Sequence, residues 1–143
     1  MTDPLGNIST TAYDALGRII SSTNAKGQST GFVYDALGRL IEVHDANDGN
    51  VSYAYDSNGN RISMTDPNGN TTTYTYNALD RLVQKDEPEG NSTIYAYDEI
   101  GNLIQLTKPN GTVIQYAYDS LNRLTTVTYP DSSKVMFTYD ANN

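Results

Sequence analysis

The side chains that could do chemistry are few in kind, and most recur at fixed spacing. His44 is the only histidine and the chain has no cysteine, so neither a histidine triad nor a histidine or thiolate metal cluster can be assembled. Carboxylates are plentiful, and glycosidases use a pair of them. The recurring aspartates, however, each open a turn, and no pair stands outside that pattern. We expect no catalytic, cofactor-binding or metal-binding residue, and a protein that is not an enzyme.

One segment invites a sharper interpretation, because it resembles a calcium-binding loop. Asp45-Ala46-Asn47-Asp48-Gly49-Asn50 places oxygen ligands at alternate positions before a glycine. The equivalent segment Lys108-Pro109-Asn110-Gly111 lacks most of them, and the downstream glutamate of an EF-hand is absent. Turn chemistry explains the segment better, with weak calcium binding at the Asp, Asn and Gly turns as the alternative.

A repeat sets the positions of all these residues. A Tyr-Asp or Tyr-Asn pair returns every 21 residues, beginning at Tyr13, Tyr34, Tyr55, Tyr76, Tyr97, Tyr118 and Tyr139. A fixed period in this range indicates a repeat architecture, in which each unit must stack on its neighbours to bury a core. We expect residues 1–143 to form a single array of about six and a half repeats.

Two turns punctuate each repeat. Asp14-Ala15-Leu16-Gly17 and Asp66-Pro67-Asn68-Gly69 both fit a type I turn followed by a residue at positive φ. The five prolines all lie twelve residues after a real or extrapolated repeat tyrosine. Asp80 and Asn122 replace the first turn glycine, and both residue types tolerate the left-handed region.

Between the turns, two runs per repeat have the composition of β-strands. Leu40–Val43 and Leu103–Leu106 represent the first run, and Thr72–Tyr76 and Ile114–Tyr118 the second. The second run alternates, so Phe32 or Tyr53 shares a face with the following repeat tyrosine, whereas small residues face the other way. Like aromatic rings should therefore lie in columns from repeat to repeat, with the column of Val135, Phe137 and Tyr139 as the last.

These hairpins predict an all-β fold. Short turns between consecutive strands favour one continuous antiparallel sheet of about thirteen strands. Because strand twist accumulates, we expect the sheet to coil as an open spiral rather than to close into a barrel. Its outer strands would present unpaired backbone groups through which other copies or neighbouring repeats can associate.

Charge and hydropathy exclude some partners. The net charge is −8, whereas nucleic acids and anionic membranes are bound by basic patches. The sequence contains neither a stretch that reads as a transmembrane helix nor a signal peptide at its start. We expect no nucleic-acid partner and no membrane insertion.

The motifs identify a resemblance to a known family. Tyr34-Asp35-Ala36-Leu37-Gly38-Arg39-Leu40, followed elsewhere by Asp-Pro-x-Gly-Asn, is similar to the YD repeat of Rhs toxins, insecticidal toxin-complex shell proteins, a wall-associated bacterial protein and teneurins. The resemblance covers essentially the whole chain. It implies β-hairpin spirals that form a hollow shell around a toxin polypeptide, or a stalk, in a parent protein that is secreted or lies at the cell surface.

The sequence also departs from the family pattern. Asn77 replaces the aspartate, and Asn60-Arg61 and Asn102 interrupt the Gly-Arg-Leu triplet. The core segment that follows the repeats in Rhs proteins, with its self-cleaving aspartates, is missing, so the resemblance carries over no autoproteolysis. Because Thr2–Asn7 reads as the back half of a repeat and the chain stops at Asn143, we expect an excised piece of a longer protein.

Two functions follow as hypotheses. The first is a non-catalytic wall that encloses or displays a toxin or other polypeptide. The second is a binding module that recognises carbohydrate, such as a surface glycan, or another cell-surface partner through an exposed tyrosine-rich face. Burial of the column of Phe32, Tyr53, Tyr74, Tyr95 and Tyr116 distinguishes them. We also expect Arg18, Arg39, Arg81 and Arg123 to pair with the aspartate of a neighbouring repeat and so to set the register.

Overall fold

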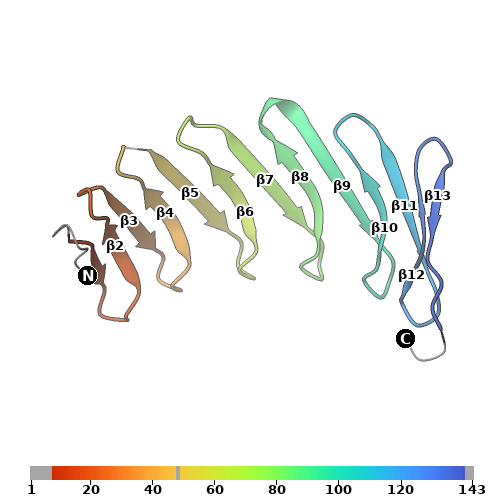
Figure 1. Ribbon diagram of the computed structural model, residues 1–143, viewed down its shortest axis with the longest axis horizontal. Coiled ribbons are helices and arrows are strands. Elements are labelled where there is room, and N and C mark those ends of the chain that lie inside the picture. The colour runs from red at the N-terminus through yellow and green to blue at the C-terminus, as the bar shows by residue number, and fades with distance from the viewer. Residues whose placement is uncertain (1–7, 48, 141–143) are drawn as a thin grey trace. The chain divides into compact units, whose positions relative to one another are not determined.

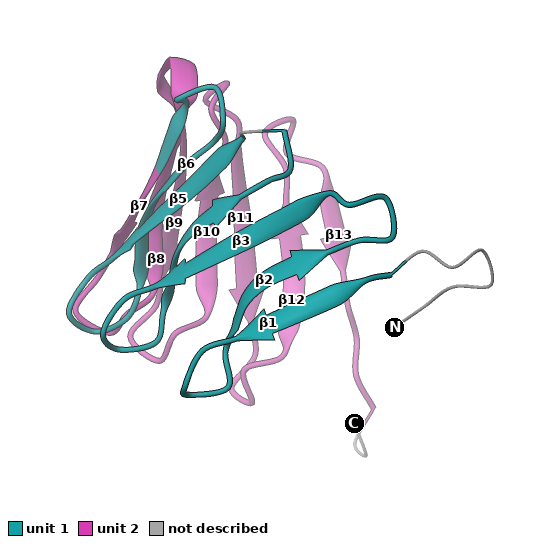
Figure 2. Cartoon of the chain, turned by 90° about the vertical axis from the view of Figure 1, so that its left-hand side faces the viewer, with its two compact units in different colours: residues 1–72 teal, residues 73–143 magenta. Residues whose placement is uncertain are grey.

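The computed structural model describes residues 8–47 and 49–140. The chain divides into two compact units, residues 1–72 and 73–143 (Figure 2). The segment Thr2–Asn7, Asp48 of the calcium-loop candidate, and Ala141–Asn143 lie outside the described residues.

Thirteen strands form one sheet, in which each strand is hydrogen-bonded to the next in chain order (Figure 1). The described strand pairings are antiparallel. The order runs from the first strand to the last without a closing pair among the described residues. The prediction of a continuous antiparallel meander is confirmed. The elements are β1 Thr10–Tyr13, β2 Ile19–Thr23, β3 Ser29–Tyr34, β4 Leu40–His44, β5 Asn50–Tyr55, β6 Arg61–Thr65, β7 Thr71–Tyr76, β8 Leu82–Glu87, η1 Pro88–Gly90, β9 Asn91–Tyr97, β10 Leu103–Thr107, β11 Val113–Tyr118, β12 Leu124–Thr128 and β13 Lys134–Met136.

The turns have the predicted form. Gly17 N donates to Asp14 O at 3.0 Å, and Gly69 N donates to Asp66 O at 3.0 Å. The strand register then shifts beside the repeat tyrosines from Tyr13 to Tyr118, as between Val33 and Tyr34, which is the bulge that such a turn produces. Asp80 has φ of 57° and Asn122 has φ of 63°, so both take the backbone conformation predicted from the missing glycines.

Some local details differ from the sequence prediction. Ser132 and Glu89 also have positive φ, although neither residue type signals that conformation. The predicted last strand is shorter, because β13 ends at Met136 rather than at Tyr139. Phe137 N still donates to Thr125 O at 2.9 Å, so the backbone continues beside β12. As an outer strand, β13 is held from one side only, which favours an early end to its regular pairing.

Four of the five aromatic rings of the predicted column lie opposite an apolar residue of the adjacent strand, and Tyr74 lies opposite Lys85. Phe32 is paired with Val43 across the strands, and Tyr116 with Val127. Among the described residues only Thr72, Ile114 and Val127 are buried, at 8%, 8% and 9% exposure, and no side chain is fully buried. The fold is therefore held mainly by contacts between adjacent strands and hairpins, rather than by a deep core.

Candidate functional site: the links between repeats

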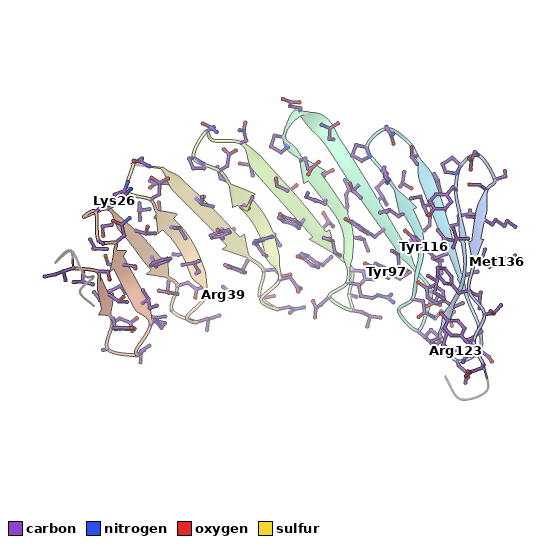
Figure 3. The ribbon with its side chains drawn as sticks, viewed as in Figure 1. Lys26, Arg39, Tyr97, Tyr116, Arg123 and Met136 are labelled. Atoms are coloured by element: carbon purple, nitrogen blue, oxygen red, sulfur yellow. The ribbon has the colours of Figure 1, made fainter. Side chains whose placement is uncertain are left out.

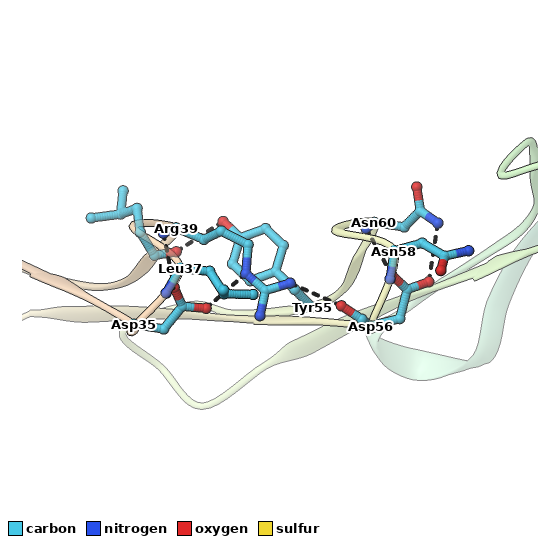
Figure 4. A network of polar contacts seen from close by, with 8 residues as sticks. Asp35, Leu37, Arg39, Tyr55, Asp56, Asn58 and Asn60 are labelled. Carbon is cyan, nitrogen blue, oxygen red and sulfur yellow. Dashed lines mark hydrogen bonds and ion pairs between the residues drawn. The ribbon is translucent and has the colours of Figure 1, made fainter.

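Each Tyr-Asp turn is held by the side chain of its own aspartate. In the second repeat, Asp35 Oδ1 accepts hydrogen bonds from Leu37 N at 2.9 Å and Arg39 N at 2.9 Å (Figure 4). Asp35 Oδ2 accepts a third from Arg39 Nε at 2.7 Å. The same three bonds recur at Asp14 and Asp119. The aspartate thus fixes both the turn and the arginine.

These bonds also keep the carboxylates ionised. The backbone amide of Arg39 lowers the pKa of Asp35 below its usual value; burial opposes this, and the Arg39 guanidinium adds to the lowering. The backbone amide of Arg123 lowers the pKa of Asp119 in the same way. A hydrogen bond to the charged form has this effect because protonation would break it.

Asparagine preserves the arrangement where arginine is missing. Asn60 Nδ2 donates to Asp56 Oδ2 at 3.0 Å, and Asn102 Nδ2 donates to Asp98 Oδ2 at 2.9 Å. In both of these departures from the family pattern the amide nitrogen takes the place of the arginine Nε.

The replacement of aspartate by Asn77 does have a cost. Asn77 Oδ1 still accepts from Leu79 N at 3.0 Å and Arg81 N at 3.1 Å. The Nε of Arg81, however, is buried and has no hydrogen-bond partner in the described structure. A carboxylate bonds this nitrogen at Arg18, Arg39 and Arg123. Leaving a buried donor unsatisfied is destabilising.

The repeat tyrosine connects each hairpin to the one before it. Tyr55 Oη donates to Leu40 O at 2.8 Å, fifteen residues earlier. The same bond, between 2.8 and 3.0 Å, is made by Tyr34, Tyr97, Tyr118 and Tyr139. Burial raises the pKa of Tyr97 and Tyr118, so these hydroxyls stay protonated donors. Sequence spacing alone did not reveal this link.

The arginines complete the connection, although not as predicted. Arg39 pairs with the aspartate of its own turn, and its Nη1 donates to the backbone carbonyl of Asp56 at 2.8 Å. Its guanidinium lies over the Tyr55 ring, 4.9 Å from the centroid. The prediction that Arg39 pairs with the aspartate side chain of a neighbouring repeat is thus wrong. The guanidinium instead pairs with the carboxylate of Asp35 in its own turn. The guanidinium spans to the next repeat through its remaining nitrogens and its face.

The same stack recurs along the chain. The guanidinium carbon lies 4.7 Å from the ring centroid for Arg18 over Tyr34, 5.1 Å for Arg81 over Tyr97 and 4.5 Å for Arg123 over Tyr139. Arg81 Nη1 also donates to Asp98 O at 3.0 Å. Adjacent hairpins are therefore joined by a tyrosine hydroxyl pointing back and an arginine reaching forward.

The residues considered for calcium or catalysis are occupied by local bonds. Asp45 Oδ1 accepts from Asn47 N at 2.7 Å and Gly49 N at 2.9 Å, and these amides, Gly49 first, lower its pKa. His44 Nδ1 contacts Asn50 Oδ1 at 2.7 Å. Over residues 8–47 and 49–140, no cluster of three or more His, Asp or Glu could hold a metal ion. That part of the chain also has no pocket and no helix suited to crossing a membrane.

Sequence analysis overlooked one charged cluster that departs from the period. Lys85 stands where other repeats have Val43, Met64 or Leu106, and its Nζ pairs with Glu87 Oε1 at 2.5 Å. Asp86 accepts from Gln84 Nε2 at 2.8 Å and from Ser92 Oγ. The signal was the run Lys85-Asp86-Glu87 in a strand otherwise expected to be apolar. Lys85 and Glu87 thus form an ion pair, whereas Asp86 is held by the neutral side chains of Gln84 and Ser92, so the cluster contributes local structure.

Comparisons with known proteins agree with this geometry. The family model described as teneurin YD-shell matches residues 6–143. The crystal structure of TcdB2-TccC3-Cdc42 is similar, with a TM-score of 0.73 and 23% identity over 85% of this chain and 7% of that chain. TcdB2-TccC3 without its hypervariable C-terminal region gives 0.71 and 24% over 85% and 7%. The Photorhabdus luminescens Tc holotoxin pore gives 0.59 and 17% over 87% and 9%.

These matches have a defined scope. At such identities the solved structures establish a shared fold. The chain spans less than a tenth of the length of each of these chains. A search of curated proteins finds no match.

Proposed function

Because the chain belongs to the teneurin YD-shell family, we propose that its hairpins form part of the wall of a shell or stalk that encloses or displays another polypeptide, such as a toxin. The chain is a structural scaffold of YD-shell repeats. Our proposal goes further in two respects: the scaffold encloses or displays a second polypeptide, and the repeats themselves catalyse no reaction.

The link between hairpins is the observation that carries this proposal. Each Tyr-Asp repeat uses its side chains to hold its own turn and the adjacent repeat, as Asp35, Arg39 and Tyr55 do. The polar groups with perturbed pKa values in the turns are those engaged in this bonding. Residues used in this way favour a structural sheet over a reactive site.

The carbohydrate-binding alternative has less support. Its ligand would stack on the column of Phe32, Tyr53, Tyr74, Tyr95 and Tyr116, yet all five rings are half-buried. Tyr53 lies opposite Met64, and Tyr95 lies opposite Leu106. No groove deep enough to count as a pocket is found over the described strands. Rings engaged in this way support packing within a wall.

Association with further repeats follows from the same proposal. The strand order begins at β1 and ends at β13, so each outer strand has one hydrogen-bonded neighbour among the described residues. We infer that these strands pair with neighbouring repeats of a larger shell or with other copies of the chain. The outer strands thus bind other β-sheets, and this association is separate from the binding of an enclosed polypeptide.

A graft tests the wall directly. Residues 8–140 replace the structurally equivalent stretch of a TcdB2-TccC3 shell that carries a protease-sensitive reporter polypeptide, and digestion of the reporter is followed by mass spectrometry. The proposal expects an assembled shell whose reporter resists protease. An assembled shell whose reporter is digested as fast as a denatured control contradicts enclosure.

A glycan array with the purified chain tests the alternative in parallel. The wall proposal expects no glycan to bind. Specific binding that Tyr53→Ala or Tyr95→Ala abolishes, with the fold intact by circular dichroism, supports the binding module instead.

A further inference from the structure

The two ends of the hairpins differ in chemistry. We compare the residue directly before the positive-φ residue of each turn. At five of the six Tyr-Asp turns from Asp14 to Asp119 it is apolar, and we call this set the Leu rim: Leu16, Leu37, Leu79, Ile100 and Leu121. At the other turns it is polar, and we call that set the polar rim: Lys26, Asn68, Glu89, Asn110 and Asp131. Within unit 1, Figure 3 shows Lys26 and Arg39 at opposite ends of the hairpins.

The Leu rim is exposed throughout. Leu16 and Leu37 are 78% and 75% exposed, and Leu79, Ile100 and Leu121 are 64%, 70% and 68% exposed. Scattered exposed leucines are ordinary on protein surfaces, whereas a regular row of them marks an interaction surface.

The turn itself does not require an apolar residue at this position. Asn58 occupies it in the third repeat and makes the same bond, with its N donating to Asp56 Oδ1 at 3.0 Å. The equivalent bond of Leu37 N to Asp35 Oδ1 is 2.9 Å. Since the turn accepts asparagine here, its hydrogen bonds do not account for the leucines.

The spacing of the rim fits a helix. Successive Tyr-Asp turns are separated by two strands, or about 10 Å. Seven residues of an α-helix rise about 10.5 Å, so side chains at every seventh position meet successive rim residues. Same-face side chains of an extended strand lie only about 7 Å apart, so they do not match the spacing of about 10 Å between rim residues. Unit 2 offers three consecutive contacts, Leu79, Ile100 and Leu121.

The charge of the rim fits a basic partner. The three unit 2 turns that carry Leu79, Ile100 and Leu121 contain four carboxylates, Asp80, Asp98, Glu99 and Asp119. They contain only two guanidinium groups, those of Arg81 and Arg123. The whole chain carries a net charge of −8. A second copy would bring like charges together, whereas Lys and Arg beside the apolar positions of a helix would complement the rim.

We propose that the Leu rim of unit 2 is a docking surface for a basic amphipathic helix with an apolar residue at every seventh position. The helix lies along the hairpin ends and crosses Leu79, Ile100 and Leu121 in turn. This surface is distinct from both faces of the sheet, so it adds a partner to the proposed wall and does not depend on enclosure.

A synthetic peptide tests the proposal with the chain as it exists. The probe is a fluorescein-labelled 21-residue helix with Leu at every seventh position and Lys beside each Leu, and anisotropy measures its binding. Leu79→Asn or Ile100→Asn should weaken binding by about tenfold each. Added salt should weaken it further. A peptide with Gln in place of Leu, and one with Glu in place of Lys, should not bind.

Two asparagines supply a matched gain-of-function pair. Asn58 and Asn68 each precede a turn glycine, with φ of 93° at Gly59 and 85° at Gly69, but they stand at opposite ends of the hairpins. Asn58→Leu gives unit 1 a third consecutive apolar residue after Leu16 and Leu37 and should increase peptide binding. Asn68→Leu adds the same side chain beside the polar rim and should leave binding unchanged.

Several outcomes overturn the docking proposal. These are no peptide binding up to about 100 μM, equal binding by the Asn variants, or equal gains from Asn58→Leu and Asn68→Leu. Self-association by sedimentation that Leu79→Asn abolishes would assign the rim to a second copy instead. Circular dichroism checks that each variant is folded. None of these results bears on the reporter protection that tests the wall.

Discussion

The hydroxyl of Tyr55 donates a hydrogen bond to the carbonyl oxygen of Leu40 at 2.8 Å, which joins two successive hairpins. Tyr53 lies on the same strand and is also half-buried, yet its hydroxyl has no hydrogen-bond partner among the described residues. Comparing Tyr55 with Tyr53 therefore distinguishes what the hydroxyl hydrogen bond contributes to stability from what the buried ring contributes.

Removing the Tyr55 hydroxyl should destabilise the fold. Tyr55→Phe keeps the ring and deletes the bond to Leu40, so we expect the free energy of unfolding to fall by about 1 kcal/mol. Urea denaturation followed by circular dichroism measures it. Tyr53→Phe is the control and should change the unfolding free energy by much less. Equal losses in the two variants would show that the hydroxyl link is not what matters.

Restoring a carboxylate beside Arg81 should stabilise the fold. Arg81 Nε is buried without a partner, and Asn77→Asp places an acceptor where Asp119 holds Arg123 at 2.8 Å. We expect a gain of about 1 kcal/mol in unfolding free energy. The gain should disappear in an Arg81→Leu background, which has no side-chain donor. A gain that persists there would have to come from another interaction.

Acid should weaken the turns. The amide of Arg39 lowers the pKa of Asp35 in the folded protein below the ordinary value of 3.8. A group whose folded pKa is lowered contributes stability above its unfolded pKa, and this is lost as pH falls through the folded pKa. The urea midpoint should therefore stay level at neutral pH, begin to drop as the pH approaches the ordinary value of 3.8, and keep dropping below it. Asp35→Asn should reduce that drop, and an unchanged pH profile would contradict the assigned role.

Backbone conformation gives a fourth prediction. Gly59 has φ of 93° with open space where a side chain would begin, whereas Gly31 lies outside the left-handed region, and a methyl group on its Cα would lie 3.7 Å from His44 Cβ. Gly59→Ala should cost about 1 kcal/mol through strain alone. Gly31→Ala should be neutral or stabilising. Thermal melts distinguish them, and similar melting temperatures for both variants would refute the conformational argument.

Much of this architecture could be predicted because it depends on spacing. The 21-residue period located the strands, and missing glycines located the positive φ of Asp80 and Asn122. Spacing does not say which atoms meet. The partner of Arg39 was misassigned, since only coordinates reveal that the carboxylate of Asp35 is filled by its own turn. The link from Tyr55 to Leu40 was missed because a backbone carbonyl leaves no signature in the sequence.

Successive hairpins are aligned so that a turn arginine stacks on the tyrosine of the next repeat, and nuclear Overhauser effects in solution measure this alignment most directly. We predict that the ring protons of Tyr34, Tyr55, Tyr97 and Tyr139 contact the side chains of Arg18, Arg39, Arg81 and Arg123 respectively. If these four rings contact other side chains instead of the paired arginines, the predicted register is contradicted.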